Sequence, residues 1–383
     1  MQKPIYMKTI SFVFLFGCIV LQSCKAQQTK TDVLKVENHL KGTLDYVSDA
    51  LNLVHTQVNE EVGIGTINTN GTINFKFPEY DIKGLHERIN LSPVKLQHWF
   101  SIDSGCKDKD VFAATPYDQV YSEKSKALFV KKYGINVAVL EAITKIENET
   151  RTYFWFYIDS AIHYKEECTK ENNSTGDIYE YVSVDIAFEK GWNFIEEHKT
   201  YAINNEGPTK TQYSKVLPTN NKVKWTLRQI QEDEKIATAK RLYNLTPLIK
   251  EQFENWVPKS LNDLMLVKQE YGNPPQGQKN KNNIQLTYAN KEKTKEIKVY
   301  IIDAAKNPDD MEMIDFVFAM ENDGKDKKDI KPYVAQYSKR QKATQLLYKV
   351  EERIVVNALA THMTGEELWS YIQKLKVEQL LQE

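Results

Sequence analysis

Apolar and polar residues alternate in short runs through the first half of the chain, which is the pattern of half-buried β-strands. Ile73, Phe75 and Phe77 alternate with polar residues shortly after Asn70-Gly71. An Asn-Gly pair between two such runs favours a hairpin with a type I′ turn, in which both central residues have positive φ. We therefore expect residues 38–80 to form a β-meander.

The following runs are typical of longer strands. Residues 127–146 have strand character, and residues 151–158, RTYFWFYI, are apolar or aromatic almost throughout. A continuous run of this kind indicates a central strand that is covered on both faces. Residues 182–188 then alternate cleanly, whereas residues 83–100 contain a short helical pattern. Residues 38–227 are therefore predicted to form an all-β domain.

The apolar period becomes helical after residue 227. A helix is predicted by a capping residue, a proline at the first helical position and apolar residues at helical spacing: Thr246, Pro247, Ile249, Phe253 and Trp256. Pro258 ends this helix. We expect residues 228–258 to be a helical connector between two folded bodies.

Residues 259–383 mix both periods. Strands are predicted at residues 262–268, 283–290, 295–302, 343–350 and 353–361, and a helix is predicted at residues 309–320. A last helix begins at the capping box Thr364–Glu367 and carries one apolar stripe, Leu368, Tyr371, Ile372 and Leu375. Because that stripe must cover a sheet face, this part is predicted to be a small α+β domain.

The N-terminus has the pattern of a secretory signal, with Lys3 and Lys8 before an apolar run of 12 residues, Ile10–Leu21. This run is too short to span a bilayer, which needs about 20 apolar residues. The ending Leu21-Gln22-Ser23-Cys24 resembles the lipidation box of bacterial lipoproteins, and SCKAQ resembles those of Bacteroidetes. The alternatives are an ordinary signal peptide with a chance cysteine, or a short anchor helix.

The resemblance implies that residues 1–23 are removed and that Cys24 receives diacylglyceryl and a further acyl chain (palmitate), which together anchor a protein firmly. Residues 24–37 would be a tether. Lys25 follows the cysteine, with no Asp to suggest retention in the inner membrane, so we expect attachment to the outer membrane. Periplasmic and surface orientations both stay open.

Composition changes this picture little. Without residues 1–23, two of the 51 basic residues are lost and 49 face 52 acidic ones, so the net charge is −3. The chain has no surplus of basic residues, which a nucleic-acid-binding protein would show. In addition to Cys24, Cys106 and Cys168 then remain. In an oxidising compartment such a pair tends to form a disulfide, and two free thiols are the alternative.

Candidate chemistry is sparse. The chain contains no G-x-S-x-G, H-E-x-x-H, C-x-x-C, Walker or EF-hand motif. His163 lies on a predicted strand near Glu166 and Glu167, which are candidate partners. The run of residues 323–329, DGKDKKD, is interpreted as a solvated turn, and Gly63/Gly65 as strand glycines. No catalytic, cofactor-binding or metal-binding residue is assigned.

A Trp/Tyr-dense strand, a polar loop, an alternating strand and then Lys190-Gly191-Trp192-Asn193 resemble uncharacterised Bacteroidetes lipoproteins with a "KGWN" region. This resemblance covers residues 38–227 and implies a β-sandwich-like domain without assigned catalytic residues. Asp159-Ser160-Ala161 also matches the short O-glycosylation pattern of exported Bacteroidetes proteins, which makes Ser160 a candidate acceptor. Trp155 and Trp192 are either core residues or a platform for stacking sugars.

Two functions follow from these observations. The first is a non-enzymatic envelope lipoprotein with a binding or structural role, which has a protein or glycan as its partner, reaches the membrane through its lipid and needs no cofactor. The second is a lipid-anchored hydrolase that acts on polysaccharide or peptide in a cleft between the two bodies. The second requires convergent carboxylates or a Ser/His pair. The oligomeric state does not follow from the sequence.

Overall fold

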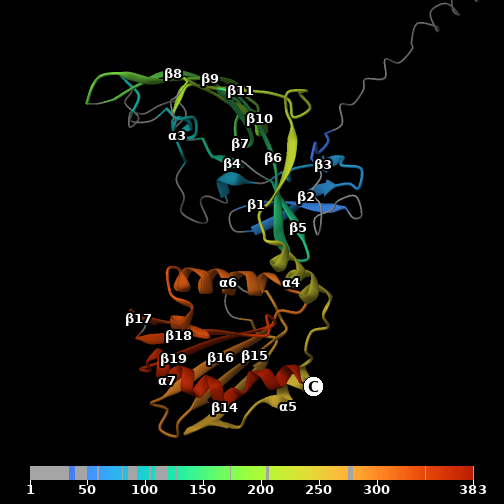
Figure 1. Ribbon diagram of the computed structural model, residues 1–383, viewed down its shortest axis with the longest axis vertical. Coiled ribbons are helices and arrows are strands. Elements are labelled where there is room, and N and C mark those ends of the chain that lie inside the picture. Colours follow the sequence, from blue (N-terminus) through green and yellow to red (C-terminus); the bar gives the residue numbers. More distant parts are fainter. Residues whose placement is uncertain are drawn as a thin grey trace, which may run out of the picture.

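The computed structural model describes the following residues of the 383-residue chain: 34–38, 50–57, 60–79, 81–84, 93–102, 105–107, 120–125, 128–172, 174–203, 207–274, 279–340 and 342–382. The predicted signal peptide and Cys24 lie outside the described residues, as does most of the predicted tether. Two β-rich bodies follow one another along the chain (Figure 1).

The packed structure begins earlier than expected, within the last residues of the predicted tether. Val36 is buried, its amide donates to the Gly71 carbonyl at 3.0 Å, and it pairs with Trp225 in a parallel bridge. Residues 34–37 therefore belong to the first body. An apolar residue at position 36, after a polar stretch, is the signal of this earlier start.

Within the described residues, twelve strands form the first sheet: β1 (Leu51–Gln57), β2 (Glu60–Ile67), β3 (Ile73–Phe75), β4 (Ser122–Ser125), β5 (Leu128–Lys132), β6 (Ile135–Ile146), β7 (Glu149–Ile158), β8 (Ile162–Glu171), β9 (Ile178–Phe188), β10 (Gly191–Tyr201), β11 (Pro208–Lys215) and β12 (Trp225–Gln229). Their order is β3-β2-β1-β5-β6-β7-β10-β11-β9-β8, with β12 on β6 and β4 on β7. The predicted β-rich character is confirmed, and these strands belong to one hydrogen-bonded sheet.

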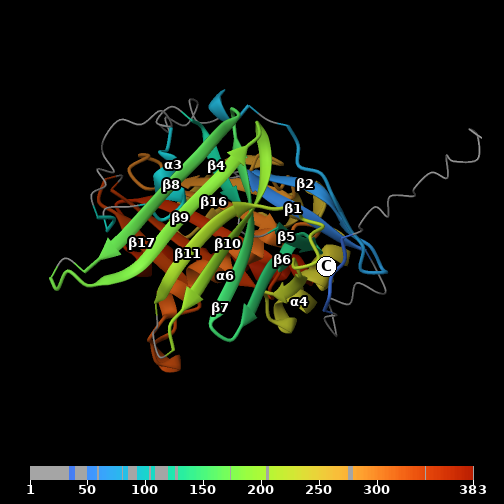
Figure 2. The same cartoon turned by 90° about the horizontal axis from the view of Figure 1, so that it is seen from above.

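The sheet bends where β6 and β7 change partners. β6 pairs with β5 through Leu140 and with β7 from Ala142 onward, while β7 pairs first with β6 and then with β4. The two halves of the sheet thus share this corner and turn across one another (Figure 2). β7 is covered on both faces, as predicted, because Tyr153 lies in one core and Phe154 and Phe156 lie in another.

The turn chemistry differs from the prediction. In the β2–β3 hairpin only Gly71 has positive φ, at 78°, and its amide donates to the Asn68 carbonyl, so the loop is a type I turn closed by a left-handed glycine. Two consecutive positive φ values occur instead at Tyr133 (52°) and Gly134 (83°), between β5 and β6. The predicted strand at residues 127–146 is therefore a hairpin.

Among the described residues, the predicted helical segment at residues 83–100 is helical at its start, where residues 82–84 are helical, and again in α3 (Leu96–Trp99). Leu96 and Phe100 are fully buried in the core of the first body that contains Phe156. This core lies on the face of β7 opposite the bend. The segment therefore covers the second face of the sheet.

The second body has a seven-stranded sheet among the described residues: β13 (Ser260–Leu261), β14 (Leu264–Tyr271), β15 (Asn283–Ala289), β16 (Glu296–Asp303), β17 (Tyr333–Ser338), β18 (Ala343–Val350) and β19 (Ile354–Thr361). Its order is β13-β14-β15-β16-β19-β18-β17. The helical elements of this body are α5 (Lys250–Trp256), α6 (Asp309–Asn322), η1 (Lys327–Asp329), α7 (Gly365–Ile372), η2 (Gln373–Leu375) and η3 (Val377–Leu381). β13 and β17 were not predicted.

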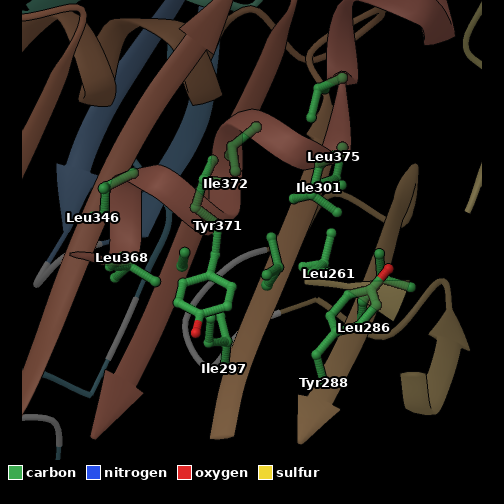
Figure 3. Close-up of a cluster of buried hydrophobic side chains, with 14 of the residues drawn as sticks. Leu261, Leu286, Tyr288, Ile297, Ile301, Leu346, Leu368, Tyr371, Ile372 and Leu375 are labelled. Carbon is green, nitrogen blue, oxygen red and sulfur yellow. The ribbon is translucent and has the colours of Figure 1, made fainter. Parts of the chain in front are cut away.

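Helices α5 and α7 pack on one face of this sheet and α6 on the other (Figure 1). The predicted stripe of the last helix is confirmed, since Leu368, Tyr371, Ile372 and Leu375 meet aliphatic strand residues in one core (Figure 3). Thr364 caps α7, because its hydroxyl accepts from the Glu367 amide at 3.1 Å.

The predicted helical connector, residues 228–258, contains more than one element. Residues 228–258 contain the end of β12, α4 (Asp233–Asn244) and α5. In α4, Ile236 lies in the core of the first body and Leu242 in a cluster of the second, so this helix joins the two bodies. α5 begins at Lys250 rather than at Pro247, because the Leu248 amide donates to the buried carboxylate of Asp303 at 2.7 Å.

Candidate binding pocket

A pocket of about 880 Å³ opens at one end of the first sheet. The end of β7, the β9–β10 turn and the segment after β3 form its walls. Its lining residues are Phe77, Pro78, Glu79, Asp81, Ile82, Lys83, Tyr157, Asp159, Lys190, Gly191 and Trp192. This volume lies in the range of about 300–1,000 Å³ that is usual for ligand sites.

An aromatic wall is set by strand register. Trp192 at the start of β10 stands opposite Tyr157 at the end of β7, with ring centroids 5.3 Å apart. Trp192 also stacks on Phe77, at 4.3 Å and 23°. Gly191 precedes it with φ of 102°, a conformation that favours glycine and turns the chain into β10. The KGWN sequence thus delivers a half-buried indole to the pocket.

The two tryptophans named in the sequence have different positions. Trp155 contacts Phe75, Phe77 and Phe194 at centroid distances of 5.4, 5.1 and 4.8 Å, and packs against the core. Trp192 lines the pocket as well as packing on the core. Core packing thus accounts for Trp155, and the platform hypothesis applies only to Trp192.

Behind the wall, His55 supports the aromatic rings. Its ring meets Trp192 edge-on at 5.2 Å and Phe77 at 5.4 Å. Burial lowers the pKa of His55, which keeps the imidazole neutral, and its Nε2 lies 3.7 Å from a carboxylate oxygen of Glu123. The residue is 4 % exposed and packs against these rings.

Charged side chains give the pocket its polarity. Asp81 accepts from the Gly84 amide at 3.0 Å, and Asp159 accepts from the Ser160 hydroxyl at 3.0 Å. Burial raises the pKa of the Tyr157 hydroxyl, and Asp159, Asp81 and Glu79 raise it further, in that order. The phenol therefore stays protonated.

The sequence pattern indicates Trp192 and the Asp159-Ser160 pair but not the acidic residues at positions 79 and 81. The pocket joins segments that are far apart in the chain, and no local pattern predicts their contact. The acidic stretch PEYD directly after the aromatic alternation of β3 is the one available signal. Ser160 is half-buried in the β7–β8 turn beside the pocket, and its glycosylation stays a prediction.

The predicted pairing of Cys106 with Cys168 is present. The two residues form a disulfide, with their Cα atoms 5.4 Å apart. Both are buried, although their sequence neighbours are polar. The bond ties the segment that contains α3 to edge strand β8, on the sheet face away from the aromatic wall. The disulfide therefore has a structural role and does not line the pocket.

Other candidates resolve as structural features. His163 pairs with Asp185 on the neighbouring strand at 2.7 Å. A Cβ on Gly65 would collide with the Asn74 backbone, so this glycine permits close strand pairing. Residues 323–329 form a turn and a short 3₁₀ helix. No cluster of potential metal ligands occurs among the described residues.

A second, smaller cleft of about 280 Å³ lies between the two bodies, where α4 faces α6. Four carboxylates line it: Glu234, Glu312, Asp315 and Glu352. Gln231 donates to Glu312 at 2.6 Å, and Lys349 pairs with Asp315 and Glu352, each at 2.6 Å. Burial raises the pKa of Glu312. Three of these acids thus serve contacts within the protein.

Comparison with family models, curated proteins and solved structures found no match to the chain. None of the helices in the described part of the chain has the length and apolar character needed to cross a membrane. The functional argument therefore depends on the pocket itself.

Proposed function

We propose that this protein is a lipid-anchored, non-enzymatic envelope protein that binds a glycan in the pocket around Trp192. The observation that supports this proposal is a half-buried indole in the wall of a pocket of about 880 Å³ that also contains carboxylates. The flat face of an aromatic ring suits the apolar face of a sugar ring, and carboxylate oxygens accept hydrogen bonds from sugar hydroxyls. Both elements of sugar recognition are thus available in one cavity.

The anchor belongs to the same proposal. Cys24, with its acyl chains, would hold the protein on the outer membrane, where glycans of the envelope or surroundings are present. Fractionation of cells and mass spectrometry of the N-terminal peptide test this part. Acyl chains on Cys24 and loss of the membrane fraction in Cys24→Ala are expected, and an unacylated soluble protein would refute the anchor.

The hydrolase alternative has less support. A carboxylate mechanism needs two acids that face a substrate, whereas three of the four acids in the cleft between the bodies hold Gln231 or Lys349. That cleft is also smaller than the pocket. Mass spectrometry of an oligosaccharide after long incubation with the protein is expected to find no cleavage products.

Binding is tested by titration calorimetry of the full-length protein in detergent with the N-acetylglucosamine tetramer. Trp192→Ala is expected to weaken binding about tenfold or more, because a buried aromatic anchor is removed from the site. Trp192→Phe retains a ring and should lose less. Trp369→Ala is the matched control, since this indole stacks on Tyr333 in the second body, at 4.7 Å.

Circular dichroism of each variant separates loss of the ring from loss of the fold. No heat of binding with the wild-type protein, or wild-type affinity in a folded Trp192→Ala variant, would overturn the assignment of the pocket.

A further inference from the structure

Exposed isoleucines mark two neighbouring turns at one end of the first sheet. Ile146 ends β6 at its turn into β7, and Ile203 lies in the turn between β10 and β11; they are 60 % and 79 % exposed. The two turns lie side by side, because β7 pairs with β10 and the Tyr201 amide donates to the Asn148 carbonyl at 2.8 Å (Figure 2). Turn residues are normally polar or small, so two adjacent apolar tips are not required by the fold.

The apolar surface continues along the same end of the sheet. β9 runs parallel to β11 and begins beside it, since Tyr181 pairs with Lys210. The first residues of β9 include the exposed Ile178, Tyr179 and Tyr181. Tyrosine is enriched where proteins meet the interface of a bilayer, because its ring has an apolar body and a polar tip.

The opposite end of the same strands has a polar character. Its turns are Asp159-Ser160-Ala161 between β7 and β8, and Glu189-Lys190 between β9 and β10. The pocket around Trp192 lies at this polar end. The 10 residues of β7 separate the two ends by about 30 Å. The first sheet therefore has one apolar end and one polar end, and the polar end carries the pocket.

A lipid anchor on Cys24 can reach a membrane that touches the apolar end. Val36 pairs with Trp225, and Trp225 pairs with Ala142 of β6. Ala142 precedes Ile146 by four residues, so Val36 is about 10 Å across the sheet and about 13 Å along it from Ile146. The chain from Cys24 to Val36 can span about 40 Å when extended. The acyl chains and the isoleucine tips can therefore enter the same leaflet.

We infer that the end of the first sheet at Ile146 and Ile203 lies on the membrane that holds the lipid anchor, with both isoleucines in the interfacial layer and the glycan pocket directed away from the lipid. This inference rests on the anchor and the glycan binding proposed above. Projecting tips suit a lipid phase, because an apolar side chain can enter it without a complementary groove. Lys145 and Glu147 flank Ile146 with opposite charges, so the contact needs no anionic lipid.

The test measures the depth of a probe beside the tips in full-length acylated protein on vesicles of phosphatidylcholine and phosphatidylethanolamine. Ala202→Cys places a fluorophore next to Ile203, and Ala161→Cys places the same fluorophore at the polar end; both alanines are exposed. Cys106 and Cys168 are bonded to each other and do not react with the label. Lipids brominated in their acyl chains should quench the probe at 202, and aqueous iodide should quench the probe at 161.

Two variants in the Ala202→Cys background separate these isoleucines from exposed apolar residues in general. Ile146→Ser/Ile203→Ser should lose quenching by brominated lipid and gain quenching by iodide, since each buried isoleucine favours the inserted state about tenfold or more. Met265→Ser/Val267→Ser removes two exposed apolar side chains from the second body and should leave the quenching unchanged. Circular dichroism verifies that both variants fold. High salt should not release the tips, because their contact does not depend on charge.

Three results would overturn the membrane contact. The first is a probe at 202 that iodide quenches as readily as the probe at 161 while the protein stays on the vesicles, which leaves the anchor in place. The second is unchanged insertion in the folded isoleucine variant. The third is protection of the probe in isolated cell envelopes but not on pure lipid, which would assign the tips to a protein partner. Failure of the wild-type protein to stay on the vesicles overturns the anchor and this inference together.

Calorimetry with the N-acetylglucosamine tetramer tests the direction of the pocket. Protein on vesicles and protein in detergent should bind the tetramer with equal affinity, because the pocket faces away from the lipid. Binding that is lost only on vesicles would overturn this orientation. Absence of binding in both states, with the probe at 202 inserted, would overturn glycan binding and leave the membrane contact in place.

Discussion

The second sheet closes its core with helices, whereas the first sheet closes much of its core on itself. Aliphatic side chains of β15, β16 and β19 pack under α5 and α7. In the first body the bend at β6 and β7 brings an aromatic group together, in which Phe75, Phe77, Trp155, Phe194 and Trp225 contact one another. The two bodies thus bury similar strands by different means.

How each core is covered determines where a ligand can reach it. A sheet covered by helices has its covered face filled, as the fully buried Leu286, Val299 and Val356 illustrate. The bent first sheet has an end where strands turn, and helix α4 packs on its core through Ile236 and Ala239. The proposed binding pocket lies at such an end, and Trp192 belongs both to the core packing and to the pocket wall. The proposed function therefore places the binding site in the first body.

The largest expected effect comes from breaking the polar clamp of the second body. Asp303 is fully buried, receives two hydrogen bonds from Arg353 at 2.9 Å each, and accepts from the Leu248 and Ala305 amides. Asp303→Ala leaves these donors without their acceptor, which should cost about 3–5 kcal/mol of unfolding free energy. Amide hydrogen exchange should show a loss of protection in β16 and β19 but not in β8 and β9.

The matched control is Asp315→Ala in the same body. Asp315 pairs with Lys349 at 2.6 Å, but both side chains are about a quarter exposed, at 26 % and 25 %. This pair should contribute about 1 kcal/mol or less. Equal losses for the two variants would contradict the view that the buried clamp, rather than ion pairing in general, holds the helices to the second sheet.

The next largest effect on stability is expected in the first body, when its disulfide is removed. The Cys106→Ala/Cys168→Ala double variant removes a cross-link over a sequence separation of 62 residues, which typically costs about 2–4 kcal/mol. Exchange should rise in β8 and β9 and stay unchanged in β16 and β19. If the second body loses protection as well, the two bodies unfold as one cooperative unit through α4.

The elements that could be predicted from sequence are those whose burial follows a local pattern. Residues 151–158 and 182–188 have the predicted burial, and β18 has the predicted bounds, because alternation reports directly which side chains avoid water. Alternation does not report which strands pair. The change of partners along β6 and β7 depends on contacts between distant segments, and the pocket, which is made by the same bend, was therefore missed.

Local signals failed where tertiary contacts compete with them. Pro247 favours a helix start, yet the buried Asp303 holds the neighbouring Leu248 amide outside the helix. Asn70-Gly71 favours a type I′ turn, but the hydrogen bond between Gly71 and Asn68 gives another loop. Two consecutive positive φ values occur instead at Tyr133-Gly134, beside Pro308 of the second body. In each case a contact with a distant residue, or a competing local hydrogen bond, outweighs the propensity of two residues.

The smallest of these effects is a pH dependence of the second body alone. Burial raises the pKa of Asp310 from 3.8 to about 6, and the hydrogen bond from Asn280 opposes this only in part. The folded state therefore holds the proton more tightly than the unfolded state. Stability is greatest below the unfolded pKa and falls as the pH rises through the folded pKa, by about 2 kcal/mol between about pH 4 and pH 7.

Asp310→Asn should remove this slope, since an uncharged amide retains an oxygen that can accept from Asn280. Asp309→Asn, at the exposed neighbouring position, should retain most of it. Urea denaturation of both variants at the two pH values, followed by exchange in β16, measures the difference. A full slope in Asp310→Asn would place the titrating group elsewhere, and a slope shared by β8 and β9 would mean that the two bodies do not differ in this respect.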